Sequence, residues 1–203
     1  RIRTGADLVC PAACVRSWSR IHLTPAEERV PAFRVESIVL EDDLSPHPVD
    51  ADDIDWIARS IGPMSGLLAE GKEKQDDRFR TAIESISTYL HAGSPRMMAT
   101  QLWAGVEALF DQQYEVSYRL STLIARLLHP PGKDCRECYR RTKKMYGERS
   151  KLVHGRKVDD QKLAEHIREV RSLLSKLLAT LIDRGSIPEA DEFDDLIFLP
   201  ENS

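Results

Sequence analysis

The segment that decides the fold is DDQKLAEHIREVRSLLSKLLATLIDRG, residues 159–185. Asp159 or Asp160 is expected to cap the start of a helix there, and Gly185, followed by Pro188, to end it. A helix with one wide apolar stripe needs neighbours to cover that stripe, so this segment predicts a helical bundle. The stripe recurs every three or four positions, at Leu163, Ile167, Val170, Leu174, Leu177, Leu178 and Leu181.

The same period recurs in five earlier segments. We expect helices over about residues 134–153, 115–128, 94–110 and 76–91, and a first helix that begins at Asp50 and has a kink or break at Gly62-Pro63. Pro130-Pro131-Gly132 is the clearest break between two of them. The predicted fold class is therefore all-α, an up-down bundle of five to six helices over residues 50–185.

The two ends of the chain differ from this bundle. Residues 1–49 carry five prolines and short β-branched runs, which indicate a short extended or β appendage. The chain begins with Arg1, so we interpret this appendage as the remnant of a longer protein. Residues 186–203 form an acidic tail whose apolar patch, Leu196–Leu199, could dock on the bundle or on a partner.

Composition narrows the class of protein. Hydrophobic residues make up 41% and charged residues 31% of the 203, as in soluble globular proteins. Neither a membrane-spanning run nor a signal segment stands out, so a cytoplasmic location without membrane contact is expected. The Cys10/Cys14 and Cys135/Cys138 pairs leave zinc conceivable, but reduced thiols are favoured. Phosphate-loop, dinucleotide, serine-hydrolase and zinc-protease motifs are missing, and no cofactor is expected.

Charge is strongly segregated along the chain. The net charge of −4 argues against attraction of nucleic acid to the whole surface. Between Arg136 and Lys157, however, the sequence has nine basic residues and only two acidic ones, Glu137 and Glu148. Such a cluster can hold a polyanion, although many charge runs are only the solvated face of a helix.

One motif closes that basic segment: Tyr146-x-x-Arg149-Ser150 followed by Leu152-Val153-His154-Gly155. With the helix Leu102-Trp103-x-x-Val106-Glu107 upstream and the segment Arg78–Leu90, it resembles the HEPN superfamily, in particular its Apea-like branch. The resemblance covers about residues 75–182. An Arg followed by His after four to six residues also occurs at Arg16/His22, which we set aside because it lies outside the bundle.

The chemistry of Arg149 and His154 fits RNA cleavage without metal. An imidazole titrates near neutrality and can move the proton of a 2′-hydroxyl or of the leaving oxygen. A guanidinium can hold the phosphate while negative charge develops. The resemblance implies that two such motifs line one cleft of a homodimer, in a toxin or phage-defence endoribonuclease. The expected substrate-binding residues are Ser150, Lys151, Arg156, Lys157, Tyr146, Arg140 and Lys144, with Glu107 in support.

Structural roles compete with these catalytic ones. His154 could simply cap a helix end, and Arg149 could pair with Glu107 or Glu148 inside the bundle. Ser150 stands where active nucleases of the superfamily often carry Asn, Asp or His, and it is a poor general base. The alternatives are a non-catalytic module that binds RNA or a nucleotide, and a dimerisation domain of a larger protein. An antitoxin or another domain is a possible further partner.

Overall fold

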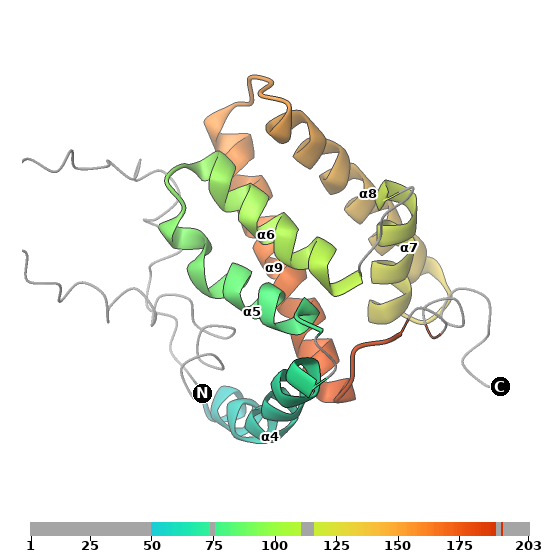
Figure 1. The fold of residues 1–203 in the computed structure, drawn as a ribbon. Helices are drawn as coiled ribbons and strands as arrows, with labels where there is room; N and C mark the ends of the chain where they lie inside the picture. The colour runs from blue at the N-terminus through green and yellow to red at the C-terminus, as the bar shows by residue number, and fades with distance from the viewer. Residues whose placement is uncertain (1–49, 74–75, 111–115, 190–191, 193–203) are drawn as a thin grey trace, which may run out of the picture.

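The computed structural model describes residues 50–73, 76–110, 116–189 and 192 (Figure 1). All its regular elements in those ranges are helical, which confirms the predicted all-α class. The expectations for residues 1–49 and for Leu196–Leu199 lie outside the described residues. The helices are α4 (Ala51–Glu73), α5 (Arg78–Thr88) with the 3₁₀ turn η2 (Tyr89–His91), α6 (Pro95–Phe110), α7 (Val116–Leu128), α8 (Lys133–Val153) and α9 (Asp160–Arg184).

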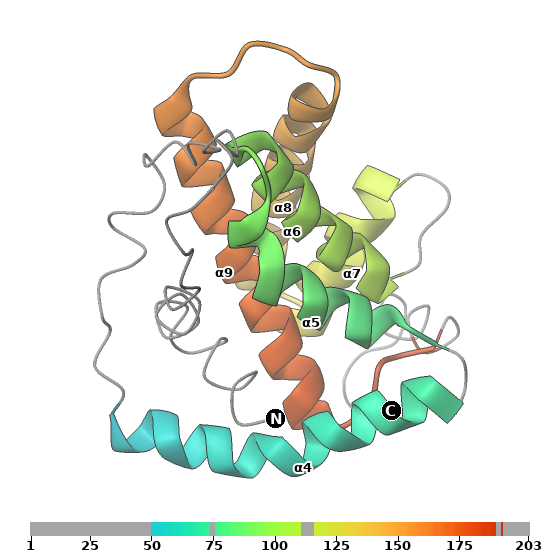
Figure 2. The same ribbon diagram turned by 60° about the vertical axis from the view of Figure 1, so that its left-hand side comes forward.

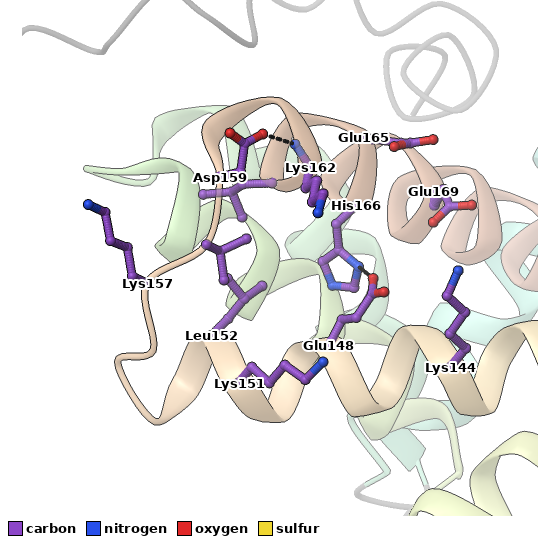
Figure 3. Close-up of a pocket in the computed structure, with 12 residues that line it drawn as sticks. Lys144, Glu148, Lys151, Leu152, Lys157, Asp159, Lys162, Glu165, His166 and Glu169 are labelled. Atoms are coloured by element: carbon purple, nitrogen blue, oxygen red, sulfur yellow. Dashed lines mark hydrogen bonds and ion pairs between the residues drawn. The ribbon is translucent and has the colours of Figure 1, made fainter.

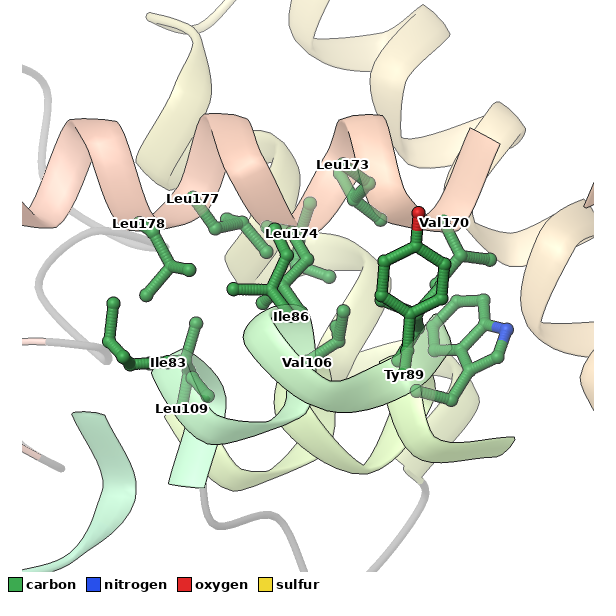
Figure 4. Packing of buried hydrophobic residues seen from close by; sticks show 14 of the residues in the cluster. Ile83, Ile86, Tyr89, Val106, Leu109, Val170, Leu173, Leu174, Leu177 and Leu178 are labelled. Atoms are coloured by element: carbon green, nitrogen blue, oxygen red, sulfur yellow. The ribbon is translucent and has the colours of Figure 1, made fainter. Parts of the chain in front are cut away.

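Helix α9 is the centre of the bundle, as its apolar stripe predicts. It packs against α6 and α5 on one side and α7 on another, while α6 also contacts α8 (Figures 1 and 2). Figure 4 shows Leu174, Leu177 and Leu178 of α9 facing Ile83 of α5 and Leu109 of α6. Each fully buried side chain of this kind contributes about 2 kcal/mol of transfer free energy. Trp103 is wholly buried here.

The helix ends follow the capping residues found in the sequence. Asp50 and Asp53 cap α4 reciprocally, because each carboxylate accepts from the other residue's backbone N–H, at 3.2 and 2.9 Å. The carboxylate of Asp159 accepts from the second and third backbone N–H groups of α9. Gly185 ends α9 with φ of 75°, a left-handed conformation that favours glycine.

Of the kink or break expected at Gly62-Pro63, the break does not occur. Helix α4 runs through both residues from Ala51 to Glu73. Pro63 is exposed, so its ring faces solvent, and only one backbone hydrogen bond of the helix is lost. The buried side chains of Met64 and Leu67 continue the packing face on the other side, which outweighs that loss. Across the described residues, no helix is both long and apolar enough to cross a bilayer.

Candidate functional site

Helix α8 carries the basic cluster, and its residues divide among several faces. At about 100° per residue, Lys144, Glu148 and Lys151 lie on one side of the helix axis, toward α9. Arg149 points instead toward α6, where it meets Glu107. His154 follows Arg149 by five positions, about 140° around the axis, so the two side chains lie on different sides of α8.

Arg149 is held by an ion pair inside the protomer. Its Nη2 donates to Oε2 of Glu107 at 3.1 Å and lies 3.0 Å from Oε1. The two side chains are 26% and 28% exposed, so the pair is half-buried. The guanidinium also lies 5.5 Å from the ring centre of Tyr146. This is the structural pairing that the sequence left open, and it gives Glu107 a defined role as the partner of Arg149.

Tyr146 connects this pair to the core. Its ring meets the Trp103 ring edge-to-face, with centroids 5.3 Å apart. Burial and the neighbouring Glu107 carboxylate raise the pKa of Tyr146, while Arg149 opposes them. The phenol therefore stays protonated at neutral pH and can act as a hydrogen-bond donor but not as a base.

His154 stands at the exposed end of α8. Its backbone N–H bonds to the carbonyl of Ser150, and Gly155 follows with φ of 69°. Gly155 and Arg156 donate to the carbonyls of Leu152 and Lys151, both at 3.1 Å, which is the Schellman pattern of helix termination. The imidazole is exposed and makes no hydrogen bond or ion pair within the described part of the chain.

Arg96 fixes the loop that follows His154. From the first turn of α6, its Nη1 donates to the Leu152 carbonyl at 3.1 Å and its Nη2 to the Arg156 carbonyl at 2.7 Å. One guanidinium thus spans the C-terminal end of α8 and the start of the loop. Sequence reasoning missed Arg96, since its acceptors are backbone groups about 60 positions away that leave no motif.

His166 is a second histidine that sequence reasoning missed. It is 3% exposed, and its Nε2 accepts a hydrogen bond from the indole Nε1 of Trp103 at 3.0 Å. A neutral imidazole that accepts at Nε2 carries its proton on Nδ1. That nitrogen faces Oε2 of Glu148 at 3.4 Å. Burial lowers the pKa of His166 below 6.5, against the opposing charges of Glu148 and Glu169, so the ring is neutral at neutral pH.

A pocket of about 490 Å³ opens between α8 and the first half of α9. Figure 3 shows His166 and Glu148 side by side within it and lysines around them. Three of the predicted substrate-binding residues line it, namely Lys144, Lys151 and Lys157, together with the unpredicted Lys162. The other predicted residues, Arg149, His154, Ser150, Arg156, Tyr146 and Arg140, lie outside its lining.

Only half of the conceivable zinc site can be described, because Cys10 and Cys14 lie outside the described residues. Cys135 and Cys138 are free thiols and half-buried. Burial raises the pKa of Cys138, opposed mainly by a hydrogen bond with Thr142, so this thiol stays protonated at neutral pH. No group of three or more metal-ligating side chains gathers among the residues that the structure describes.

Comparison with known proteins finds no matching family model, no matching curated protein and no matching solved structure.

Proposed function

We propose that this chain is a metal-independent endoribonuclease of the HEPN type, which acts as a homodimer through Arg149 and His154. The observation that supports it most is the position of His154. An imidazole that has no hydrogen bond or ion pair with any described residue stands at the exposed end of a strongly cationic helix, on a loop that Arg96 holds in place. An acid/base group needs both this access and this fixed position.

The proposed reaction needs two proton transfers. The 2′-hydroxyl of one nucleotide attacks the adjacent phosphorus while one His154 takes its proton. The bond to the 5′ oxygen breaks, and a second imidazole gives that oxygen a proton. The products are a 2′,3′-cyclic phosphate and a 5′-hydroxyl. One chain has a single His154, so a dimer that pairs two copies of the motif supplies both groups.

Arg149 would hold the phosphate in this scheme. Its Nη2 contacts Glu107 and its Nε is buried without a hydrogen-bond partner among the described residues, so Nη1 is the nitrogen that could reach a phosphate. Glu107 fixes the guanidinium while leaving part of its fork for a phosphate oxygen. Ser150, Arg156 and Arg140 remain candidates for contacts along the RNA backbone.

A labelled single-stranded RNA incubated with EDTA tests the proposal. The wild-type chain should produce shortened fragments that end in a cyclic phosphate, and His154→Ala should remove them without a change in melting temperature. His129→Ala is the matched control, because His129 precedes α8 at its other end, and it should cleave normally. Retained cleavage in His154→Ala, or loss in His129→Ala, would refute the assignment.

The ion pair of Arg149 favours a second candidate. A guanidinium engaged with Glu107 serves the stability of one protomer equally well, as in a non-catalytic module that binds RNA or a nucleotide, or in a dimerisation domain. A non-catalytic binding module would bind RNA with an affinity that falls steeply with salt, and would produce no fragments. A dimerisation domain would form a dimer and neither bind nor cleave RNA. Sedimentation of the wild type and of Arg149→Met, with and without RNA, measures dimer formation and RNA binding. The nuclease and the RNA-binding module both require RNA binding, and only the nuclease also produces fragments in the cleavage assay.

A further inference from the structure

The face of α8 that leads to His154 carries cations and no acidic residue of that helix. At about 100° per residue, Arg136, Lys143 and His154 all lie within about 60° of Tyr139 around the helix axis. These three side chains are exposed. The two glutamates of the basic segment lie instead on the side toward α9, where they line pockets together with α9 residues. A negatively charged chain laid along this outer face of α8 therefore meets no repelling carboxylate from the helix itself.

A tyrosine cluster stands at the other end of this outer face from His154. It consists of Tyr118 on α7, which packs against α8 (Figures 1 and 2), and of Tyr139 and Lys143 on α8. The two rings meet edge-to-face with their centroids 6.2 Å apart. The ammonium group of Lys143 lies 5.5 Å from the centre of the Tyr139 ring and donates to its hydroxyl at 3.1 Å. Tyr118 is nevertheless 56% exposed, so the contact within the cluster leaves much of this ring open to a ligand.

The cations beside the cluster keep donors for a ligand. Among the described residues, the guanidinium of Arg136 makes no hydrogen bond or ion pair. Lys143 has three donor hydrogens and uses one of them for the Tyr139 hydroxyl. A cationic helix face alone is commonly only solvated. An open aromatic ring next to such cations adds the second contact that single-stranded nucleic acids use, because a base stacks on the ring while the phosphates lie against the cations.

We propose that the tyrosine cluster is a subsite for an unpaired base of the RNA strand that His154 cuts, with Arg136 and Lys143 on the flanking phosphates. This inference rests on the proposed function, since it concerns the substrate of the same site. None of the cluster residues belongs to the binding residues expected from the sequence, because Tyr118 comes from another helix and the two tyrosines meet only in the fold.

The position of the cluster sets the length of RNA that can use it. Tyr139 and His154 are 15 positions apart along α8. At 1.5 Å per residue this separation is about 22 Å. Successive phosphates of a stacked strand are roughly 3.4 Å apart, so about six or seven nucleotides bridge the distance. The substrate class is therefore single-stranded RNA of more than about seven nucleotides, and a trinucleotide at His154 cannot reach the cluster.

Two other polyanions fit the tyrosine cluster less well. The bases of an RNA duplex stack on one another and are not free to stack on a side chain. An acidic peptide would meet the cations but would leave the ring of Tyr118 without a partner. The ring is thus the feature that favours a single strand, and both other ligands are included in the test.

Fluorescence anisotropy of the full chain with a labelled single-stranded 2′-O-methyl RNA of about twelve nucleotides tests the subsite. This RNA has no free 2′-hydroxyl, so binding is measured without cleavage. The wild type should bind saturably, and Tyr118→Leu should weaken the affinity about tenfold. The matched control is Tyr118→Phe, which keeps the ring and should bind as the wild type does. Circular dichroism shows whether both variants are folded.

The salt dependence of the same binding tests the cations. For a single strand, each phosphate contact contributes about 0.7 to the slope of the logarithm of the binding constant against that of the salt concentration. Arg136→Gln and Lys143→Gln should each lower the slope by about this amount. Lys176→Gln is the matched control, because Lys176 is exposed on α9 away from the outer face of α8, and it should leave the slope unchanged.

Cleavable RNA separates the subsite from the nuclease. Tyr118→Leu should slow cleavage of a strand of about twelve nucleotides and leave that of a trinucleotide unchanged. Three results would each overturn the subsite: equal binding of the 2′-O-methyl strand by the wild type and Tyr118→Leu, equal affinity of the wild type for a duplex of the same sequence, or binding of polyglutamate as tightly as RNA. Binding that depends on Tyr118 without any cleavage by the wild type would instead refute the nuclease alone.

Discussion

The indole N–H of Trp103 donates to Nε2 of His166 across 3.0 Å, between two side chains that are almost completely buried. Tryptophan is only a donor, so this bond exists only while Nε2 of the histidine is unprotonated. Protonation of His166 at both nitrogens would turn an attractive contact between α6 and α9 into one between two donors. The contact between α6 and α9 in the core therefore depends on the protonation state of His166, and so on pH.

The first prediction concerns stability against pH. The pKa of His166 is below 6.5 in the folded chain because of burial, whereas the unfolded chain keeps the ordinary value. At pH values between the folded and the unfolded pKa, the unfolded state binds more protons than the folded state. The contribution of His166 to the free energy of unfolding is therefore fully present above pH 6.5 and decreases as the pH drops below it. The slope reaches at most about 1.4 kcal/mol per pH unit. Denaturant unfolding at a series of pH values measures it.

The control for this prediction is His166→Gln, which keeps an acceptor for Trp103 but has no titrating group. The fall in stability just below pH 6.5 should become smaller in this variant, and His154→Gln, at an exposed site, should behave as the wild type. If the free energy of unfolding of His166→Gln falls just as steeply below pH 6.5 as that of the wild type, a group other than His166 causes the loss of stability at acidic pH.

The second prediction concerns the pair of Arg149 and Glu107. Arg149→Met leaves a half-buried carboxylate with no cation, and Glu107→Gln leaves the guanidinium with a weaker acceptor. Each single change should cost about 1–2 kcal/mol, and the double variant should show a coupling of about 1 kcal/mol. A double-mutant cycle in urea measures it. Coupling near zero would show that solvent screens the pair and that it has no structural role.

The same variants separate structural from catalytic roles of Arg149. Glu107→Gln keeps the guanidinium and loosens its restraint, so RNA cleavage should persist in this variant while the melting temperature falls. Arg149→Met should lose RNA cleavage even at temperatures where the variant is still fully folded, so its loss of stability would not account for its loss of activity. Equal activity in the two variants would assign Arg149 to structure alone.

The third prediction concerns two glycines within helices. A Cβ on Gly105 of α6 would lie 2.7 Å from Cβ of Ser85 on α5 and 3.0 Å from Leu174 on α9, so Gly105→Ala forces α6 away from these two helices. We expect it to cost about 1–3 kcal/mol despite the better helix propensity of alanine. Gly147→Ala on α8 meets no atom within 4 Å and should stabilise the chain by about 1 kcal/mol. Thermal unfolding of both variants compares them, and a stabilised Gly105→Ala would contradict this close packing.

The helices could be predicted from the sequence because their signals are local. The apolar stripe of residues 163–181, the cap at Asp159 and the stop at Gly185 depend on neighbours within four positions, and the structure confirms both ends of this helix. The sequence did not decide between a kink and a break at Gly62-Pro63, because the effect of Pro63 depends on which side of α4 faces solvent. That orientation is a property of the tertiary structure.

The site could be predicted only in part, for the same reason. Lys144, Lys151 and Lys157 belong to one basic run, but Lys162 joins them in the pocket from another helix. His166 sits among the apolar residues of α9, three positions after Leu163, and a histidine on such a face is the one signal that could have pointed to it. Its donor Trp103 is 63 positions away, and no local pattern connects them.

The last prediction concerns Arg96, which ties the start of α6 to the loop after His154. Arg96→Met removes donors from the carbonyls of Leu152 and Arg156, which can then bind water, so the global cost should stay near about 1 kcal/mol. The loop should loosen much more than the bundle. Amide hydrogen exchange at Gly155 and Arg156 should therefore accelerate, while protection from exchange in the middle of α9 should fall only as far as global stability does.

Arg80→Met is the matched control for this variant. Arg80 is exposed on α5 and pairs with Asp77 only three positions away, so its loss should change stability by a few tenths of a kcal/mol and leave the loop unaffected. If the loop positions His154 for proton transfer, Arg96→Met should also lower the rate of RNA cleavage with an intact imidazole, and Arg80→Met should not. Unchanged exchange at Gly155 in Arg96→Met would show that the Schellman turn holds the loop without the guanidinium.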